Sequence, residues 1–249
     1  MSGHSKWASI KHKKAVVDAR RGQQFTKLAR AVTVAAREGG GDPDGNPALA
    51  LAIQKARDAS MPKENIERAI GKGTGEGVDT DRIENVLYEG YGPGGVALLI
   101  EALTDNRNRT GADIRHLLTK NGGNLGEPGS VSYLFQKQGV IIVDASRYDE
   151  EDLIPAIDAG ALDISVDDDV FEVITEPGDL VAVRDALAAA GIDIESADVV
   201  QQPMSRVPVE EADATRLIRL IDALEESDDV SAVNANFDVD AAVLERIAS

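Results

Sequence analysis

The residues of this chain that indicate a chemical role most clearly are the cations near its N-terminus. The first 37 residues contain nine Lys or Arg and a single acid, whereas the rest contain seventeen bases and forty-three acids. A dense set of cations attracts the phosphate backbone of a nucleic acid, and an acidic remainder limits how much of the protein can lie along it. The chemistry that this charge distribution indicates is binding of a polyanion.

The strongest candidate for such binding is an N-terminal arm, residues 1–22. Six cations fall within sixteen residues, and Trp7 among them can stack on an unpaired base. If six phosphates of a single strand were neutralised, log K would fall against log salt with a slope of about −4. The competing interpretation is a solvated tail with no partner. The arm supplies these candidate nucleic-acid-binding residues: Lys6, Trp7, Lys11, His12, Lys13, Lys14, Arg20 and Arg21.

The first predicted helix, Gln23–Glu38, adds two candidates to this set. Its apolar side chains recur with helical spacing, and Lys27 and Arg30 lie mostly off that face, towards solvent. Three glycines end this helix, and Asn46-Pro47 is the pattern of an N-cap and first position for the next. With a third helix after Met61-Pro62, the sequence predicts a small helical domain over residues 23–75.

Arg107 and Arg109 form a second candidate constellation, within the run Asp105–Thr110. The run precedes a predicted helix that ends at Lys120, where free backbone N–H groups can also face an anion. The competing interpretation is that these residues only cap the helix, with Asp105 or Asn108 as the N-cap. Both interpretations are compatible, because a capping side chain leaves the two arginines available for phosphate.

Catalysis by this chain is not expected. The sequence contains no Cys, which excludes disulfides, thiolate zinc sites and cysteine nucleophiles. The three His have no neighbouring base-and-orienter pair of the kind that nucleophilic catalysis uses. Residues 71–74 superficially resemble a phosphate-binding loop, but no Ser or Thr follows Lys72. We therefore expect no enzymatic activity, no cofactor and no metal site.

Composition and hydropathy bound the class of protein. At 249 residues the chain exceeds one typical domain, and its apolar residues make up 43% of the sequence. No apolar run approaches the ~20 residues that cross a bilayer, so no membrane association is expected. The basic N-terminus lacks the apolar segment of a secretory signal. We expect a cytoplasmic protein, and the sequence leaves its oligomeric state open.

Beyond a Gly-rich linker at residues 73–80, strands and helices alternate. Two strands joined by a Gly-rich hairpin loop and a further short strand at Val131–Phe135 are predicted first. The order β-α-β-β-α-β over residues 138–202 is that of a ferredoxin-like domain. A last helix and strand cannot form a domain alone and are expected to complete the sheet that begins at Glu84. The predicted fold is α+β, with a helical domain, a discontinuous α/β domain (81–137 plus 203–249) and an inserted ferredoxin-like domain, both with mainly antiparallel sheets.

Several motifs, in order along essentially the whole chain, give it a close resemblance to the YebC family. The opening Gly-His-Ser-Lys-Trp-Ala-Ser-Ile-Lys-His-Lys-Lys is the longest of them. The motifs that carry the resemblance are Gly3–Lys14, Asp18–Gly22, Phe25–Lys27, Tyr88–Gly95, Asp105–Thr110, Gly122–Gly126 and Leu217–Leu224. The resemblance implies three domains around a central cavity and a role in gene expression. The chain departs from the family in the Asp-rich residues 138–202, which puts nucleic-acid contact there in doubt.

Within that family, two functions are described and remain open for this chain. Bacterial members are commonly labelled probable transcriptional regulatory proteins, and some are described as DNA-binding repressors. Relatives include mitochondrial translational activators and ribosome-associated factors. The sequence contains no clear helix-turn-helix, and a charge of about −26 beyond residue 37 opposes broad duplex contact. We therefore favour a non-enzymatic translation factor that binds rRNA or the ribosome, with a DNA-binding transcriptional regulator as the alternative.

Overall fold

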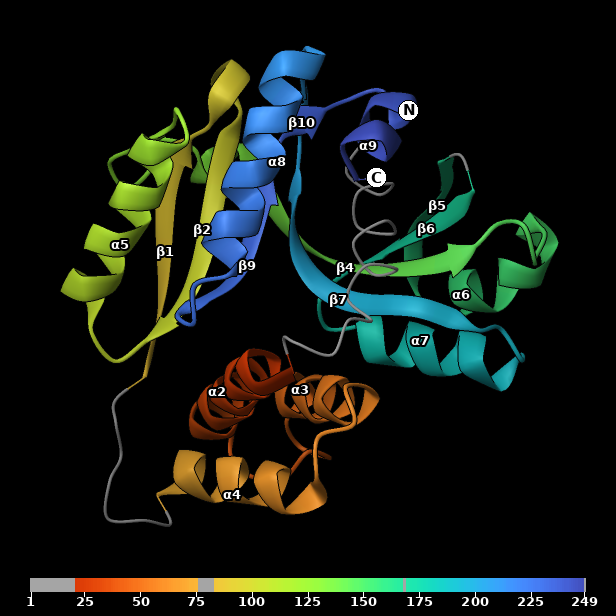
Figure 1. Cartoon of the computed structure of the whole chain (residues 1–249). Coiled ribbons are helices and arrows are strands. Elements are labelled where there is room, and N and C mark those ends of the chain that lie inside the picture. The colour runs from red at the N-terminus through yellow and green to blue at the C-terminus, as the bar shows by residue number, and fades with distance from the viewer. Residues whose placement is uncertain (1–20, 76–82, 168, 249) are drawn as a thin grey trace.

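A bundle of three helices opens the computed structural model, which describes residues 21–75, 83–167 and 169–248 (Figure 1). Their apolar side chains, among them Val32, Leu49 and Ile66, form a core of their own. The three helices predicted for this stretch are confirmed. They are α2 (Arg21–Gly39), α3 (Pro47–Asp58) and α4 (Lys63–Thr74).

Asn46 fixes the angle between α2 and α3. Its Oδ1 accepts a hydrogen bond from Leu49 N at 3.1 Å, which caps α3 as the Asn46-Pro47 pattern predicts. Its Nδ2 donates to the carbonyl oxygens of Ala35 and Gly40, at 2.8 and 2.9 Å, near the end of α2. One amide side chain therefore satisfies backbone groups near the end of α2 and at the start of α3.

The second unit is built on sheet A, whose strands lie in the order β3-β1-β2-β9. All its pairings are antiparallel. Helices α5 and α8 cover one face, and their apolar side chains meet those of β2 and β9 in the largest core cluster (Figure 1). The members are β1 (Glu84–Tyr91), β2 (Ala97–Thr104), α5 (Arg107–Lys120), β3 (Asn124–Leu125), α8 (Glu211–Glu225) and β9 (Val230–Ala235).

The helix and strand predicted after Pro203, which are α8 and β9, complete the sheet that begins at Glu84. Strand β9 pairs with β2 from Leu98↔Ala235 to Ala102↔Val230. The short strands β8 (Val207–Pro208) and β10 (Phe237–Asp238) form a separate parallel pair, and the final helix α9 (Ala241–Ala248) was not revealed by the sequence pattern. Long-range pairing thus joins segments about 130 residues apart, because neither half buries its apolar face alone.

Sheet B forms the third unit, with strands in the order β5-β6-β4-β7, all antiparallel. Counted along the chain, this order is 2-3-1-4, which is the ferredoxin-like arrangement predicted from the β-α-β-β-α-β pattern. Helices α6 and α7 pack on one face around Leu153, Val183 and Leu187. The elements are β4 (Phe135–Asp144), α6 (Ile154–Asp158), β5 (Ala161–Asp167), β6 (Val170–Thr175), α7 (Leu180–Ala189) and β7 (Ile194–Pro203).

The prediction of a short strand at Val131–Phe135 is wrong. Residues Ser132–Leu134 form a 3₁₀ helix, and β4 begins at Phe135. The reason is the buried carboxylate of Glu89, which accepts N–H bonds from Gly129, Val131 and Ser132 at 2.7, 2.6 and 2.8 Å. Burial raises the pKa of Glu89, but these three donors outweigh it and hold that pKa below its usual value.

The strand ends can be compared with the predicted boundaries between the two α/β domains. Strand β4 starts before the predicted boundary at 137/138, while β7 ends at Pro203, so the division of residues 81–249 into two domains stays a prediction.

Among the residues that the structure describes, no helix has the length and apolar character to cross a bilayer.

Candidate nucleic-acid interface

Three cations of α2 contact the α/β unit beside it, whereas helical spacing predicted them towards solvent. The Nη1 atom of Arg30 lies 2.7 Å from Asp229 Oδ1 and 2.9 Å from the carbonyl oxygen of Asp228. The Nζ atom of Lys27 donates to the carbonyl oxygen of Glu225 at the end of α8. Arg37 donates to the carbonyl oxygen of Ile83 at 2.6 Å. The expectation of a solvent-facing cationic stripe on α2 is therefore corrected: these side chains attach the helical bundle to its neighbour.

Asp229 is the centre of this junction, and the sequence interpretation missed it. Its side chain is 9% exposed and lies just before β9, where it meets Arg30 from α2 and Arg109 from α5. Thr110 Oγ1 donates to Oδ2 at 2.6 Å, and Arg109 Nη2 lies 2.9 Å from the same oxygen. Thr104 Oγ1 lies 3.4 Å away. A single carboxylate thus joins three elements that are distant in sequence.

The electrostatics of Asp229 follow from these partners. Burial alone raises the pKa of a carboxyl group, but the hydrogen bonds from Thr110, Arg109 and Arg30 dominate and lower the pKa of Asp229 to about 2. The same contacts, together with Asp105, raise the pKa of Arg109 further above its usual value. Asp229 and Arg109 therefore keep their charges at physiological pH. The network is an ion cluster that joins α2, α5 and the residue before β9.

The Asp105–Thr110 run caps its helix, although the N-cap is neither of the two residues that we predicted. Asn106 is the N-cap of α5, and its Oδ1 accepts from Arg109 N at 3.1 Å. Arg107 pairs with Glu84 of β1, and Arg109 pairs with Asp105 at 2.6 Å. The side chains are nevertheless 64% and 47% exposed, so a phosphate can reach both arginines.

Helix α5 carries further basic side chains that the sequence interpretation did not single out. Arg115, His116 and Lys120 are all exposed. At helical spacing His116 and Lys120 lie on the same side of α5 as Arg109, with Asp113 as the acid among them, and Arg115 lies at the edge of that side. In the sequence, basic residues at helix positions opposite Ile114 and Leu118 were the signal that could have identified this surface. Within the acidic part of the chain, this helix offers a surface that favours anions.

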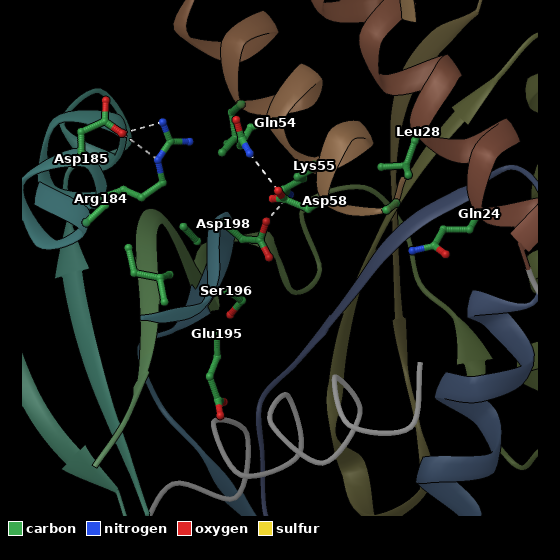
Figure 2. Close-up of a pocket in the computed structure, with 15 residues that line it drawn as sticks. Gln24, Leu28, Gln54, Lys55, Asp58, Arg184, Asp185, Glu195, Ser196 and Asp198 are labelled. Carbon is green, nitrogen blue, oxygen red and sulfur yellow. Dashed lines mark hydrogen bonds and ion pairs between the residues drawn. The ribbon is translucent and has the colours of Figure 1, made fainter. Parts of the chain in front are cut away.

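A cleft of about 720 Å³ separates the helical bundle from sheet B (Figure 2). Gln54 Nε2 donates to Asp58 at 2.8 Å, Lys55 pairs with Asp198 of β7, and Arg184 pairs with Asp185 on α7. With Glu195, the lining holds four acids and two bases. This balance disfavours a polyanion, so the cleft is not part of the candidate interface. Among the described residues, no group of His, Cys, Asp or Glu side chains has the arrangement of a metal site.

The remaining candidates fall at or before the start of α2. Lys6, Trp7, Lys11, His12, Lys13, Lys14 and Arg20 lie outside the described residues. Arg21 is the first residue of α2. The structure therefore brings together two of the predicted contacts, Arg30 and Arg109, at Asp229, while Arg107 stands apart beside Glu84.

Comparison with known proteins places this chain among proteins of similar length. Two family models match it, described as the TACO1/YebC protein N-terminal domain (residues 5–76) and the TACO1/YebC second and third domain (residues 83–237). A probable transcriptional regulatory protein of Rubrobacter xylanophilus is 55% identical over 249 residues, covering 100% of both chains. One of the same description from Acidothermus cellulolyticus is 56% identical over 248 residues, covering 99% of this chain and 100% of that one.

A solved structure gives the same result for the fold. The crystal structure of a conserved hypothetical protein from Aquifex aeolicus superposes with a TM-score of 0.83 at 49% identity. The match covers 93% of this chain and 96% of that one. The fold is therefore shared over most of the length of both proteins.

Proposed function

Because the chain belongs to the TACO1/YebC family, we propose that it regulates gene expression as a ribosome- or RNA-associated translation factor anchored by its basic N-terminal arm. The role of regulator follows the description of its relatives, which are named probable transcriptional regulatory proteins and not enzymes. Attachment to RNA, and the residues that make it, are our own inference from charge and geometry.

The observation that carries the proposal is the separation of charge. Residues 1–75 contain fourteen bases and seven acids, whereas residues 76–249 contain twelve bases and thirty-seven acids. A polyanion is attracted to the first part and repelled by most of the second. Binding is therefore expected through the arm, with the exposed cations of α5 as a second contact, and with the acidic sheet B turned away.

The junction at Asp229 supports a single strand or a folded RNA over a long duplex. Lys27 and Arg30 of α2 are engaged with sheet A and α8, so α2 offers few cations to a major groove. RNA loops present unpaired bases, on which an aromatic side chain such as Trp7 stacks. Trp7→Ala is expected to weaken binding of single-stranded RNA more than binding of duplex DNA, as measured by fluorescence anisotropy of labelled oligonucleotides.

The second candidate function is a DNA-binding transcriptional regulator. What favours it is the description of the relatives in Rubrobacter and Acidothermus as probable transcriptional regulatory proteins. The arm would then contact duplex DNA without help from α2. This function predicts arm-dependent binding to promoter-length DNA and no arm-dependent association with ribosomes.

Co-sedimentation with ribosomes separates the two candidates. The full chain and a chain lacking residues 1–21 are pelleted with ribosomes at low and high salt, with promoter-length DNA as competitor. Arm-dependent, salt-sensitive sedimentation that survives the DNA supports the translation factor. Absence of sedimentation together with arm-dependent DNA binding supports the transcriptional regulator.

A matched pair of triple variants tests whether position or charge alone matters. Replacing Lys11, Lys13 and Lys14 with Ala should flatten the slope of log K against log salt by about 2 on single-stranded RNA. The control replaces three exposed, ion-paired arginines of the α/β units with Ala and should leave that slope nearly unchanged. Equal losses would mean that net charge, and not the arm, determines binding. The control residues are Arg147, Arg216 and Arg246.

A further inference from the structure

Helix α6 and strand β5 expose a local group of large apolar side chains. Seven such side chains are exposed in the described part of the chain, and four of them come from residues 154–166. Single exposed apolar residues are common on any protein surface, whereas a group of them indicates an interaction site. We call residues 154–166 the β5 edge. Its exposed apolar side chains are Ile154, Ile157, Leu162 and Val166.

Strand β5 has one open side. Sheet B has the order β5-β6-β4-β7, so within the described residues β5 pairs with β6 alone. The strand at the other margin contacts the rest of the chain, because Asp198 of β7 pairs with Lys55 of the helical bundle. Strand β5 therefore lies on the side of sheet B away from the bundle (Figure 1). Backbone N–H and C=O groups on its open side can pair with an added strand.

The strand register shows which side chains an added strand would meet. Val166 lies opposite Phe171, which belongs to the core beneath α6 and α7, so Val166 shares that face of the sheet. Val166 is nevertheless 58% exposed, since β6 flanks it on one side only. Asp163 lies opposite Ile174 and therefore belongs to the other face. The β5 edge thus offers an apolar position on one face and a carboxylate on the other.

Strand β5 lacks the residues that most often block an open edge. Edge strands are commonly protected by Lys or Pro, by a very short length or by a bulge. Strand β5 has seven residues without Lys or Pro, and its irregularity lies at the start, between Ala161 and Asp163. From Asp163 to Asp167 its register with β6 is continuous. This stretch has the length of an ordinary strand and can therefore accept a neighbour.

Charge around the β5 edge specifies the partner. Residues 149–169 contain nine acids and no Lys, Arg or His, and Asp158 and Asp163 are exposed beside the apolar group. Two copies of β5 paired with each other would bring like charges together, which disfavours a second copy of this chain. A strand that alternates basic and apolar residues matches both faces, because its apolar side chains meet Val166 and its cations meet Asp163.

We propose that the β5 edge binds a basic, extended segment of a partner protein, which adds to sheet B as a fifth strand. Backbone hydrogen bonds to β5 supply affinity, and alternate side chains of the segment supply specificity. This surface is separate from the arm and from the cations of α5, so it goes beyond the proposed function and does not depend on RNA binding. The acidic composition of residues 149–169 then has a role: it selects basic partners and repels copies of itself.

A set of synthetic peptides tests the chemistry of the partner. The probe is a fluorescein-labelled peptide of alternating lysine and valine with the seven-residue length of β5. Its anisotropy should rise on titration with the full chain at low salt. Peptides with glutamate in place of lysine, or serine in place of valine, should bind at least about tenfold more weakly. Equal binding of the lysine–serine peptide would show that charge alone attracts it, and would overturn the proposal.

Strand addition is tested through the backbone. The lysine–valine peptide methylated on its backbone nitrogens keeps its charges and side chains but cannot donate hydrogen bonds, so its binding should be lost. In the full chain, the unmethylated peptide should slow hydrogen exchange in β5 and leave exchange in β1 unchanged. Undiminished binding of the methylated peptide, or protection elsewhere than in β5, would refute addition at this edge.

A matched pair of variants tests the position of the site. Val166→Lys places a cation on the β5 edge and should weaken binding of the lysine–valine peptide by about tenfold. Leu87→Lys makes the same change of charge at a leucine of β1 that is 49% exposed, and should leave binding unchanged. Equal losses in both variants would refute a site at β5. Sedimentation that shows a dimer, abolished by Val166→Lys and with no binding of peptide, would assign the edge to a second copy and refute a basic partner.

Discussion

The junction between the helical bundle and sheet A differs in kind from the core beneath α8. The core of sheet A is a continuous apolar cluster in which Leu217, Leu220 and Leu224 of α8 are fully buried against the sheet. The junction is polar, and its main contacts come from Lys27, Arg30 and the carboxylate of Asp229. Apolar burial supplies free energy in proportion to area, whereas ion pairs largely exchange water for protein contacts. The core should therefore determine stability, and the junction should determine how the bundle is oriented.

The largest expected effect tests the core side of this comparison. Leu217→Ala deletes a fully buried side chain of α8 and should lower the free energy of unfolding by about 3 kcal/mol. The measurement is urea denaturation followed by circular dichroism. The matched control is Leu162→Ala, at a leucine that is 55% exposed, where a change below about 0.5 kcal/mol is expected. Similar losses at both sites would contradict the assignment of the core.

Asp229→Ala tests the junction and should have the second largest effect. It leaves Arg30 and Arg109 without their common partner and removes the acceptor of Thr110. Because both arginines retain access to water, we expect a loss of about 2 kcal/mol, less than for a fully buried pair. Asp228→Ala, at the exposed neighbour, is the control. A loss confined to Asp228→Ala would refute the central role of Asp229.

Acid should weaken the junction before it weakens the apolar core. The pKa of Asp229 is lowered to about 2 from 3.8, so its contribution is fully present above the unfolded value and is lost as the pH falls towards 2. We expect about 1–2 kcal/mol of stability to disappear between roughly pH 5 and pH 2, after allowance for partial solvation. Denaturant titrations over this range measure it. The same titrations on Asp229→Asn should show a shallower decline.

Arg30→Gln should change orientation more than stability. The Arg30–Asp229 pair is partly solvated, so we expect a loss of at most about 1 kcal/mol. The expected signature is faster cleavage in limited proteolysis between α4 and β1, because the bundle is less firmly held. Arg57→Gln, at an exposed cation on α3, is the matched control. Unchanged proteolysis in Arg30→Gln would mean that the remaining contacts suffice to hold the bundle.

The smallest effect on stability is expected at the surface of α5. Arg115→Ala combined with Lys120→Ala removes two exposed cations and should leave the free energy of unfolding within about 0.5 kcal/mol of the parent. RNA affinity should nevertheless fall, and its salt slope should flatten by about 1 on a single strand. Anisotropy titrations at several salt concentrations measure both. An unchanged slope would restrict the proposed interface to the arm.

Much of the fold followed from the sequence because its determinants are local. The spacing of apolar residues identified α2 and α8, Asn46-Pro47 marked the start of α3, and the alternation of elements over residues 138–202 predicted the ferredoxin-like strand order. These signals act within a few turns or strands. The exception, Ser132–Leu134, departs from the predicted strand because Glu89, forty residues away, binds its backbone.

The sequence by itself determined the partition of charge, most of the helices and strands, and the candidate cations of the arm and of α5. Only the tertiary structure decided which of those cations are engaged. Arg30 meets Asp229, which lies 199 residues further along the chain, and no local pattern specifies that choice. The physical reason is that helix periodicity states which side of a helix is polar, whereas the partner of a charge depends on which surfaces the packing of apolar cores brings within a few ångströms.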